Sequence, residues 1–192
     1  MSDLQLHFEG PFTFCDKPDS VFRSTFCESA GIYLWTIRQT NDSTHLIHYV
    51  GETAQLGNRQ REHLIQILGL NYGIFDPDKA RQGVCELLWG GWWRDRTPDA
   101  PSRTLSEYRR LNEDVVRYVE AISIFFAELN VESKLRKHVE GCIGWNLRSN
   151  HADCKQLYPD DNHVGIMKVR ESGQLLITAP EVIRGLDAST GY

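Results

Sequence analysis

The stretch that decides the fold is Gly31-Ile32-Tyr33-Leu34-Trp35-Thr36-Ile37, followed by His45-Leu46-Ile47-His48-Tyr49-Val50-Gly51. Both runs are rich in the β-branched and aromatic residues that favour strands. The polar segment between them, residues 38–44, contains an Asn-Asp-Ser sequence that is typical of turns. The sequence therefore predicts a β-hairpin, in which Tyr33 and Tyr49 lie on neighbouring strands and share one face.

After the second run, the spacing of the apolar residues changes from that of a strand to that of a helix. Apolar residues at helical spacing predict a helix over residues 56–70. Arg59 and His63 are four residues apart, so they lie on one face of this helix. Two tyrosines, an arginine and a histidine can then meet where the hairpin joins the helix. The alternative for each alone is structural, namely a cross-strand aromatic pair and a solvated helix face.

In this order and spacing the residues resemble the GIY-YIG nuclease superfamily, which includes homing endonucleases, restriction enzymes and a repair endonuclease domain. Arg59 stands eight residues past Gly51, and His63 is similar to a subset that includes restriction enzymes. A complete member also has a glutamate on a later helix and an asparagine after it. Glu140 borders the apolar stripe of a predicted helix over residues 134–143. Asn150 follows it, with Asn146 as the alternative.

The resemblance covers about residues 29–150, with two departures from the family pattern. The stretch between the first helix and the third strand is long, and the spacing from Glu140 to Asn150 is short. The implied fold is an α/β (α+β) domain with a small central antiparallel sheet flanked by helices. Residues 1–28 are expected to be an N-terminal extension, residues 71–105 an insertion, and residues 151–192 a C-terminal hairpin extension packed on the same domain.

The resemblance also implies a function, that of a metal-dependent endonuclease that hydrolyses DNA phosphodiester bonds. Phosphodiester hydrolysis needs an acceptor for a water proton, stabilisation of charge on the phosphate, and help for the leaving oxygen. In the family the first tyrosine accepts the proton and the second positions the water. Glu140 would hold Mg²⁺ or Mn²⁺, since one carboxylate suffices for magnesium. The expected catalytic set is Tyr33, Tyr49, Arg59, His63, Glu140 and Asn150. The alternative is a non-catalytic nucleic-acid-binding or protein-interaction domain that retains the nuclease fold.

Charge is unevenly distributed along the chain. The net charge is −5, but residues 53–117 hold ten basic residues, of which nine are arginine. Arginine suits bidentate phosphate contacts. We therefore expect a phosphate-facing strip on an acidic body, with DNA as the partner and contacts from Arg61, Arg94 and Arg96. The neighbouring tryptophans have two interpretations, packing or base stacking, and packing is favoured: Trp89, Trp92 and Trp93.

Other elements can be placed from local patterns. They are a strand over residues 4–8 ended by Glu9-Gly10-Pro11, a helix over residues 107–119 capped by Ser106, a strand over residues 122–126, a helix capped by Asn130 with Glu132 in its first turn, and a hairpin of residues 163–170 and 174–178.

Bulk properties favour a soluble cytoplasmic protein. The sequence has no apolar segment long enough to span a membrane, and its start does not resemble a secretory signal. Five cysteines, an odd number, suit a reducing compartment. One metal alternative stays open: His138, Cys142, His151 and Cys154 have spacings compatible with zinc, although Cys142 also belongs to an apolar helix stripe.

Overall fold

A computed structural model of the chain describes residues 3–15, 18–92, 94, 96–151, 154, 173–180 and 182–192. The fold is α+β, as expected. Its strands are β1 (Leu4–Phe12), β2 (Gly31–Arg38), β3 (His45–Thr53), β4 (Ile74–Phe75), β5 (Leu87–Trp89), β6 (Ile122–Glu128), β7 (Gln174–Thr178), β8 (Ile183–Arg184) and β9 (Ser189–Gly191). Its helices are the short 3₁₀ helix η1 (Val21–Arg23), α1 (Leu56–Leu68), α2 (Pro77–Ala80), α3 (Ala100–Ala121) and α4 (Ser133–Asn150).

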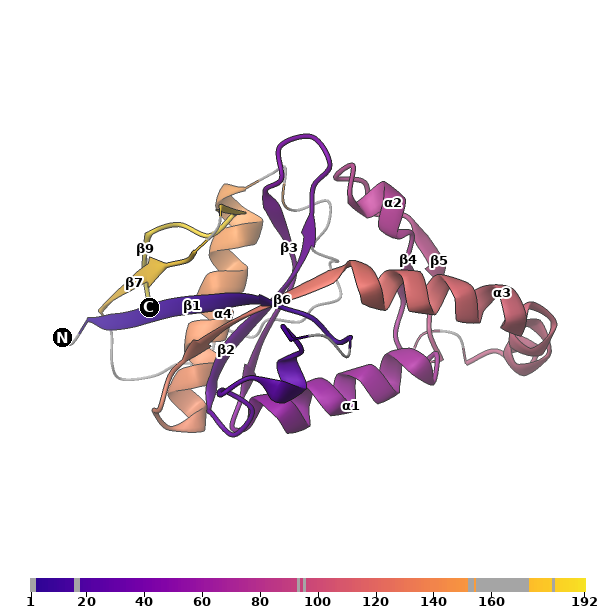
Figure 1. Ribbon diagram of the computed structural model, residues 1–192, viewed down its shortest axis with the longest axis horizontal. Helices are drawn as coiled ribbons and strands as arrows, with labels where there is room; N and C mark the ends of the chain where they lie inside the picture. Colours follow the sequence, from indigo (N-terminus) through magenta and orange to yellow (C-terminus); the bar gives the residue numbers. More distant parts are fainter. Residues whose placement is uncertain are drawn as a thin grey trace.

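One large sheet forms the centre of the molecule (Figure 1). It has seven strands in the order β8-β3-β2-β6-β1-β7-β9. The four middle strands are antiparallel, whereas β7 pairs with β1 and β8 with β3 in parallel. The expectation of a small sheet was therefore wrong in size, because strands from both ends of the chain extend the predicted antiparallel centre.

The predicted hairpin is confirmed by the pairing of β2 with β3. Tyr33 lies opposite Gly51 and Trp35 opposite Tyr49, and an irregularity follows between Trp35 and Thr36. All residues of β2 except its last are buried. Strand β2 is buried because it lies inside the sheet, between β3 and β6, and has core side chains on both faces.

Three predicted boundaries were wrong. Strand β1 continues through Glu9-Gly10-Pro11 to Phe12, because a register shift accommodates the proline, whose nitrogen cannot donate to a ladder. Helix α3 begins at Ala100 with proline in its first turn, so Ser106 is inside the helix and donates to the Arg103 carbonyl oxygen (2.7 Å) rather than capping it.

Helix α4 also begins later than expected. Its N-cap is Glu132, which makes no capping bond with its side chain, and Asn130 lies outside the helix. At its other end the helix includes Asn150 as its last residue. Of the predicted C-terminal hairpin, residues 174–178 form β7, while residues 163–170 lie outside the described part of the chain. The described partners of β7 are β1 and β9.

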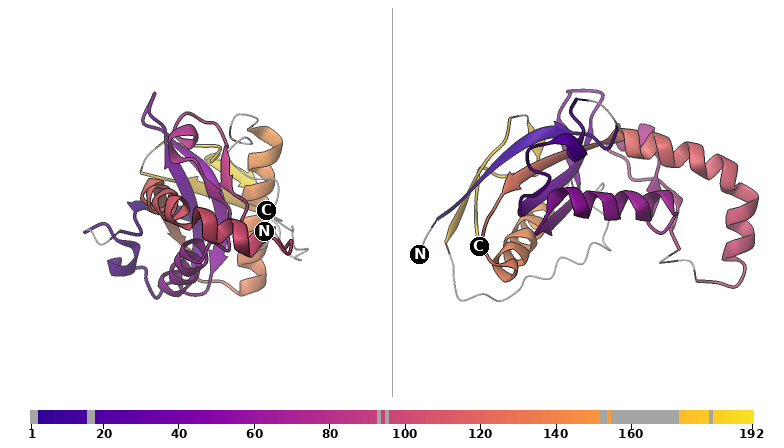
Figure 2. Two further views of the ribbon diagram at one scale, coloured as in Figure 1. Left: turned by 90° about the vertical axis from the view of Figure 1, so that its right-hand side faces the viewer. Right: turned by 60° about the horizontal axis from the view of Figure 1, so that its bottom comes forward.

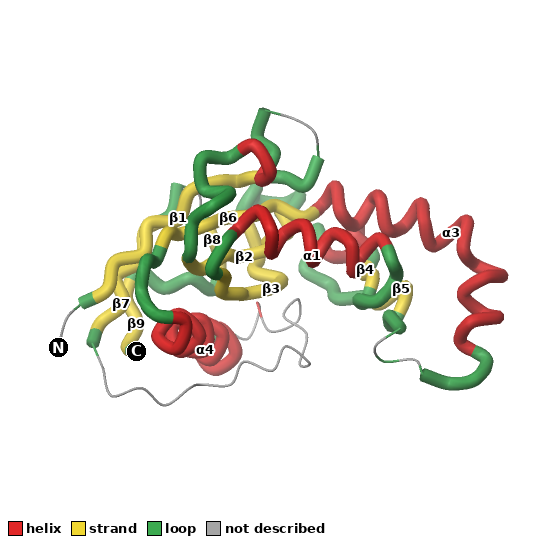
Figure 3. The backbone as a smooth tube through the Cα atoms, turned by 90° about the horizontal axis from the view of Figure 1, so that it is seen from below, coloured by secondary structure: helices red, strands yellow, loops and turns green. Residues whose placement is uncertain are grey.

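The predicted insertion forms a small substructure of its own. Strands β4 and β5 make a two-stranded sheet that lies between α1 and α3, and α3 extends away from the end of β6 (Figures 1 and 2). In the view from below, β4 and β5 again lie beside the C-terminal part of α1 (Figure 3). Two bonds to the Leu70 carbonyl oxygen hold this substructure against the end of α1, one from the Trp89 indole (2.9 Å) and one from the Trp92 amide (3.0 Å).

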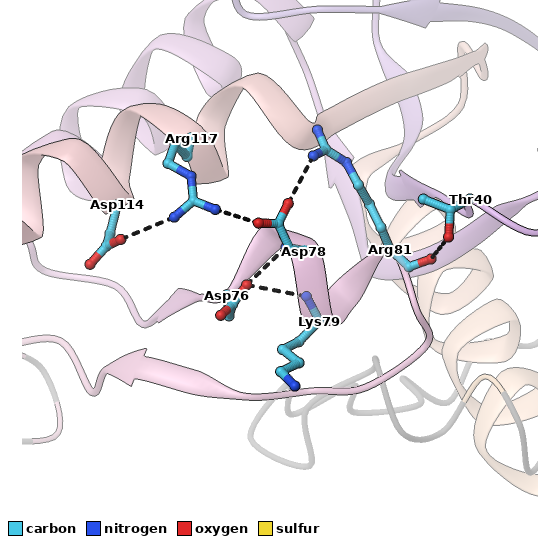
Figure 4. A network of polar contacts seen from close by, with 7 residues as sticks. All are labelled: Thr40, Asp76, Asp78, Lys79, Arg81, Asp114 and Arg117. Atoms are coloured by element: carbon cyan, nitrogen blue, oxygen red, sulfur yellow. Dashed lines mark hydrogen bonds and ion pairs between the residues drawn. The ribbon is translucent and has the colours of Figure 1, made fainter.

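An ion-pair network attaches α2 to α3 (Figure 4). Asp78 accepts from Arg117 (2.6 Å) and from Arg81 (3.2 Å), and Arg117 also contacts Asp114 (3.5 Å). Asp76 caps α2 by accepting from the amides of residues 78 and 79. The carbonyl oxygen of Arg81 accepts from the Thr40 amide (3.1 Å), which joins the network to the end of the hairpin.

Two glycines of the hairpin are required by close approach. A Cβ added at Gly51 would lie 2.2 Å from Cζ of Tyr33, its cross-strand partner. A Cβ added at Gly31 would lie 2.1 Å from the carbonyl oxygen of Ala127 on β6. The glycines that flank the two tyrosines therefore have a packing reason to be glycine.

We expect Gly51→Ala to destabilise the protein by about 1–3 kcal/mol, because the buried Tyr33 ring must shift to admit the methyl group. Gly191→Ala is the matched control, since a Cβ there meets no atom within 4 Å. Urea unfolding of both variants measures the difference. If Gly51→Ala is as stable as the control, the contact with the Tyr33 ring does not constrain this position.

Candidate active site

Four of the predicted site residues line one cavity of about 400 Å³: Tyr33, Tyr49, Arg59 and Glu140. They come from β2, β3, α1 and α4 in turn. The cavity is mostly polar, because its remaining walls are formed by Glu52, Thr53, Ala54 and Lys137. Helix α4 reaches this position by packing mainly along β3.

Tyr33 is fully buried, and its hydroxyl is hydrogen-bonded to Nε2 of His63 (2.6 Å). Its ring stacks on that of Tyr49, with the centroids 5.9 Å apart. Burial and the neighbouring Tyr49 raise the pKa of Tyr33 well above its usual value, although the charge of Arg59 opposes this. Burial has the larger effect, so the charge of Arg59 does not bring this pKa down to its usual value.

His63 is enclosed by aromatic rings. Its ring meets Trp35 (4.8 Å between centroids) and Tyr49 (5.5 Å) edge to face, and it is 2% exposed. Burial, together with the charge of Arg59, lowers its pKa to about 3. His63 is therefore neutral at physiological pH, and its other nitrogen, Nδ1, is buried without a hydrogen-bond partner in the described part of the chain.

Arg59 forms part of the cavity wall. Its side chain is 39% exposed and pairs with Glu62 (2.9 Å) one turn further along α1. Exposed pairs of this kind are weak, so the guanidinium can exchange Glu62 for a phosphate.

Glu140 faces a second carboxylate that sequence analysis missed. Burial, and then the charge of Glu52, raise the pKa of Glu140 to about 7, while Arg59 and Lys137 oppose the shift. Glu52 is itself held by Arg136 (3.0 Å), one turn before Glu140 on α4. The signal for Glu52 was available, because an acidic residue in an otherwise apolar strand needs a partner.

The donor set of this cavity fits magnesium or manganese. Glu140 and Glu52 both line the cavity and present only oxygen atoms, which are the ligands that these hard cations prefer. Among the described residues, no group of three or more His, Cys, Asp or Glu side chains is arranged to hold a metal ion. A hard divalent cation that retains several waters needs only one or two carboxylates.

Asn150 lies away from this cavity. Helical rise puts it about 15 Å along α4 from Glu140. Its amide donates to Asn146, which in turn donates to Asp187 (2.7 Å). Neither asparagine lines the cavity, so the structure does not bring the sixth predicted site residue to the other five.

Some arginines of residues 53–117 form ion pairs with carboxylates of the same segment. Arg81, Arg110 and Arg117 pair with carboxylates of α2 and α3. The three arginines expected to contact DNA are exposed: Arg61, Arg94 and Arg96. Arg61 donates to Asn58 (2.9 Å) on its own helix. Of the neighbouring tryptophans, Trp89 and Trp92 pack against the core with their rings 6.1 Å apart, as favoured, and Trp93 lies outside the described residues.

The four residues with zinc-compatible spacing do not come together. His138 Nε2 and Cys142 Sγ are 3.6 Å apart on α4. His151 instead pairs with Asp187 (3.0 Å), and Cys154 is buried in the core.

No protein-family model matches this chain, and no curated protein or solved structure matches it either. None of the helices in the described ranges is both long and apolar enough to cross a bilayer. The function must therefore be argued from the cavity itself.

The raised pKa of Glu140 predicts a stability difference that depends on pH. Its pKa is 4.5 in the unfolded chain and about 7 in the fold, so the folded state loses stability as the pH rises from about 4.5 to 7. Glu140→Gln removes this loss. We expect it to be more stable than the parent by about 1–3 kcal/mol at pH 8, with the difference vanishing near pH 4. Urea unfolding with a chelator present, at both pH values, measures it. If Glu140→Gln differs from the parent by the same unfolding free energy at both pH values, the raised pKa of Glu140 is contradicted.

Proposed function

We propose that this protein is a metal-dependent endonuclease that hydrolyses DNA phosphodiester bonds. The observation that carries the proposal is the convergence of Tyr33, Tyr49, Arg59 and Glu140, from four separate elements, on one polar cavity. These residue types supply a proton acceptor, a phosphate-binding cation and a carboxylate for a hard metal ion. The resemblance to the GIY-YIG superfamily is consistent with this assignment.

Each side chain has a role that its position supports. Arg59, which is partly exposed on the cavity wall, binds the phosphate and stabilises the charge that develops on it. Tyr49, which stacks on Tyr33, holds the attacking water beside it. Glu140, with Glu52 near it, would hold Mg²⁺ or Mn²⁺. Such an ion, when bound, acts as a Lewis acid on the phosphate and assists departure of the leaving oxygen.

The hydrogen bond between Tyr33 and His63 defines the proton path. The Tyr33 hydroxyl and Nε2 of neutral His63 share this hydrogen bond, and we assign the phenol as its donor, which leaves the phenol oxygen as an acceptor for a water proton. As the water attacks, its proton passes to Tyr33, and the original phenol proton passes to His63. The imidazolium that forms is then stabilised by the negative charge on the phosphate. Neither group has to ionise before substrate binds, which suits their pKa values in the free protein.

A non-catalytic nucleic-acid-binding domain is the second candidate, and the bond between Tyr33 and His63 is compatible with it. A fully buried tyrosine with a raised pKa, bonded to a neutral histidine, is also what a purely structural pair looks like. The two candidates are distinguished by whether the protein cleaves DNA.

The test of function is incubation of the protein with supercoiled plasmid and with branched or nicked duplexes, with and without Mg²⁺ or Mn²⁺. We expect metal-dependent strand cleavage that Glu140→Ala abolishes, because the alanine removes a carboxylate ligand. Glu113→Ala, an exposed acidic residue on α3, is the matched control and should cleave normally. Binding without cleavage of any of these substrates would favour the non-catalytic candidate.

We expect Tyr33→Phe to lower single-turnover cleavage by about a hundred- to ten-thousand-fold, with little change in DNA affinity, because only the proton acceptor is lost. Thr36→Val is the structural control, since it removes a buried hydroxyl that is hydrogen-bonded to buried His45 (2.8 Å) and lines neither cavity. Both variants should lose similar stability, while only Tyr33→Phe loses most of its rate. Tyr49→Phe should have a smaller effect. If both site variants cleave at the parent rate, the tyrosines are structural.

A further inference from the structure

A second cavity adjoins the first. It has a volume of about 510 Å³, and it shares two wall residues, Tyr49 and Arg59, with the cavity that contains Glu140. A phosphate bound by Arg59 would therefore lie between the two cavities. Glu52 and Glu140 lie on one side of this phosphate, and the second cavity lies on the other side.

The second cavity is lined mainly by rings. Beyond Tyr49 these belong to Trp35, His48, His63, Tyr72, Phe75 and Tyr118. Much of one wall comes from the insertion, which contributes Asn71, Tyr72, Gly73, Phe75, Gly90 and Arg94. Aromatic walls around a space of this size suit a flat, unsaturated ligand.

Polar groups are present for such a ligand. The side-chain amides of Gln66 and Asn71 line the cavity, and neither makes a hydrogen bond within the described part of the chain. His63, which also lines it, has a buried Nδ1 with no partner. A buried nitrogen without a partner is uncommon and marks a position that a ligand can satisfy. Amides and an imidazole nitrogen can pair with the donors and acceptors on the edge of a nucleobase.

We propose that this second cavity binds the base of an unpaired nucleotide next to the phosphate held by Arg59. The inference rests on the proposed function and narrows its substrate class to DNA that contains an unpaired nucleotide beside the cleaved bond. A stacked, paired base cannot enter a cavity without being extruded, and extrusion is least costly where the base is already unpaired. Tyr72, half-buried on the wall from the insertion, is the side chain best placed to stack on the base.

The test is equilibrium binding of full-length protein, in chelator, to two duplexes that differ by one unpaired 2-aminopurine nucleotide. We expect the bulged duplex to bind about tenfold more tightly than the paired one, in line with one stacked base. The 2-aminopurine emission should change on binding, since the base moves into an aromatic environment. Equal affinity for the two duplexes, or unchanged emission, would overturn the proposal.

Two variants and one control test the location. Tyr72→Ala should abolish the preference for the bulge and leave the affinity for paired DNA unchanged. Gly90→Leu should do the same by obstructing the cavity, and it removes no side chain; a Cβ at Gly90 meets no atom within 4 Å. Tyr108→Ala, an exposed tyrosine on α3 that lines neither cavity, should keep the preference. A preference that survives in both cavity variants would overturn the proposal.

A free nucleotide is the other source of a nucleobase. Competition with deoxyadenosine monophosphate separates the two, because a pocket for DNA should need a large excess of monophosphate to displace the bulged duplex. Displacement at comparable concentrations would assign the cavity to free nucleotides instead.

Failure of the proposed function gives a different result. Selective binding of the bulged duplex without cleavage in Mg²⁺ would support the base-binding cavity and reject the nuclease function. Metal-dependent cleavage without a preference for the bulged duplex would support the nuclease function and reject the base-binding cavity.

Discussion

The close approach of the Tyr33 ring to Gly51, which leaves no space for a Cβ there, is the constraint on which the site depends. Because these residues are cross-strand partners, the ring can lie over the neighbouring strand only where that strand has no side chain. The ring then reaches α1, where its hydroxyl meets His63. The ring of Tyr49 stacks on the same side, since the register places it diagonally from Tyr33. One pair of residues thus sets the direction of the whole aromatic group against α1.

Electrostatics adds a second constraint at the same place. Burial, and then the charge of Glu52, raise the pKa of Glu140, while Arg136 holds Glu52 in position. Nothing in packing alone requires two carboxylates there, and isolating them from water is unfavourable. A cation bound between the two carboxylates would relieve their repulsion. The acidic character of the molecule is therefore no argument against a phosphate site, since Arg59 supplies positive charge where the phosphate would bind.

The predictable parts of this structure are those set by local sequence. The hairpin and α1 follow from residue period, and the convergence of the two tyrosines with Arg59 follows from their adjacency along the chain. Glu140 was reached only through the family pattern, because its approach to β3 is a long-range contact. The sheet was underestimated for the same reason: the pairing of β1 with β7 joins residues that are far apart in sequence. Asn150 was misplaced because α4 continues through it, and local propensity does not fix where a packed helix ends.

The insertion is attached to the rest of the fold at more points than a connection between α1 and α3 requires. It is held at three places: by Trp89 and Trp92 on the end of α1, by Asp78 on Arg117 of α3, and by Arg81 on Thr40 of the hairpin. Attachment to three separate elements is more than a surface loop needs. The result is a fixed wall of Tyr72 and Phe75 opposite the aromatic face of the hairpin, with Arg59 between this space and the carboxylates. Tyr49 and Arg59 come from the hairpin and α1, so any ligand that fills the second space must contact the group that would hold the phosphate. Under the proposed function, recognition of the nucleotide and positioning of the bond to be cleaved would be the same event, because both would depend on the position of one guanidinium group.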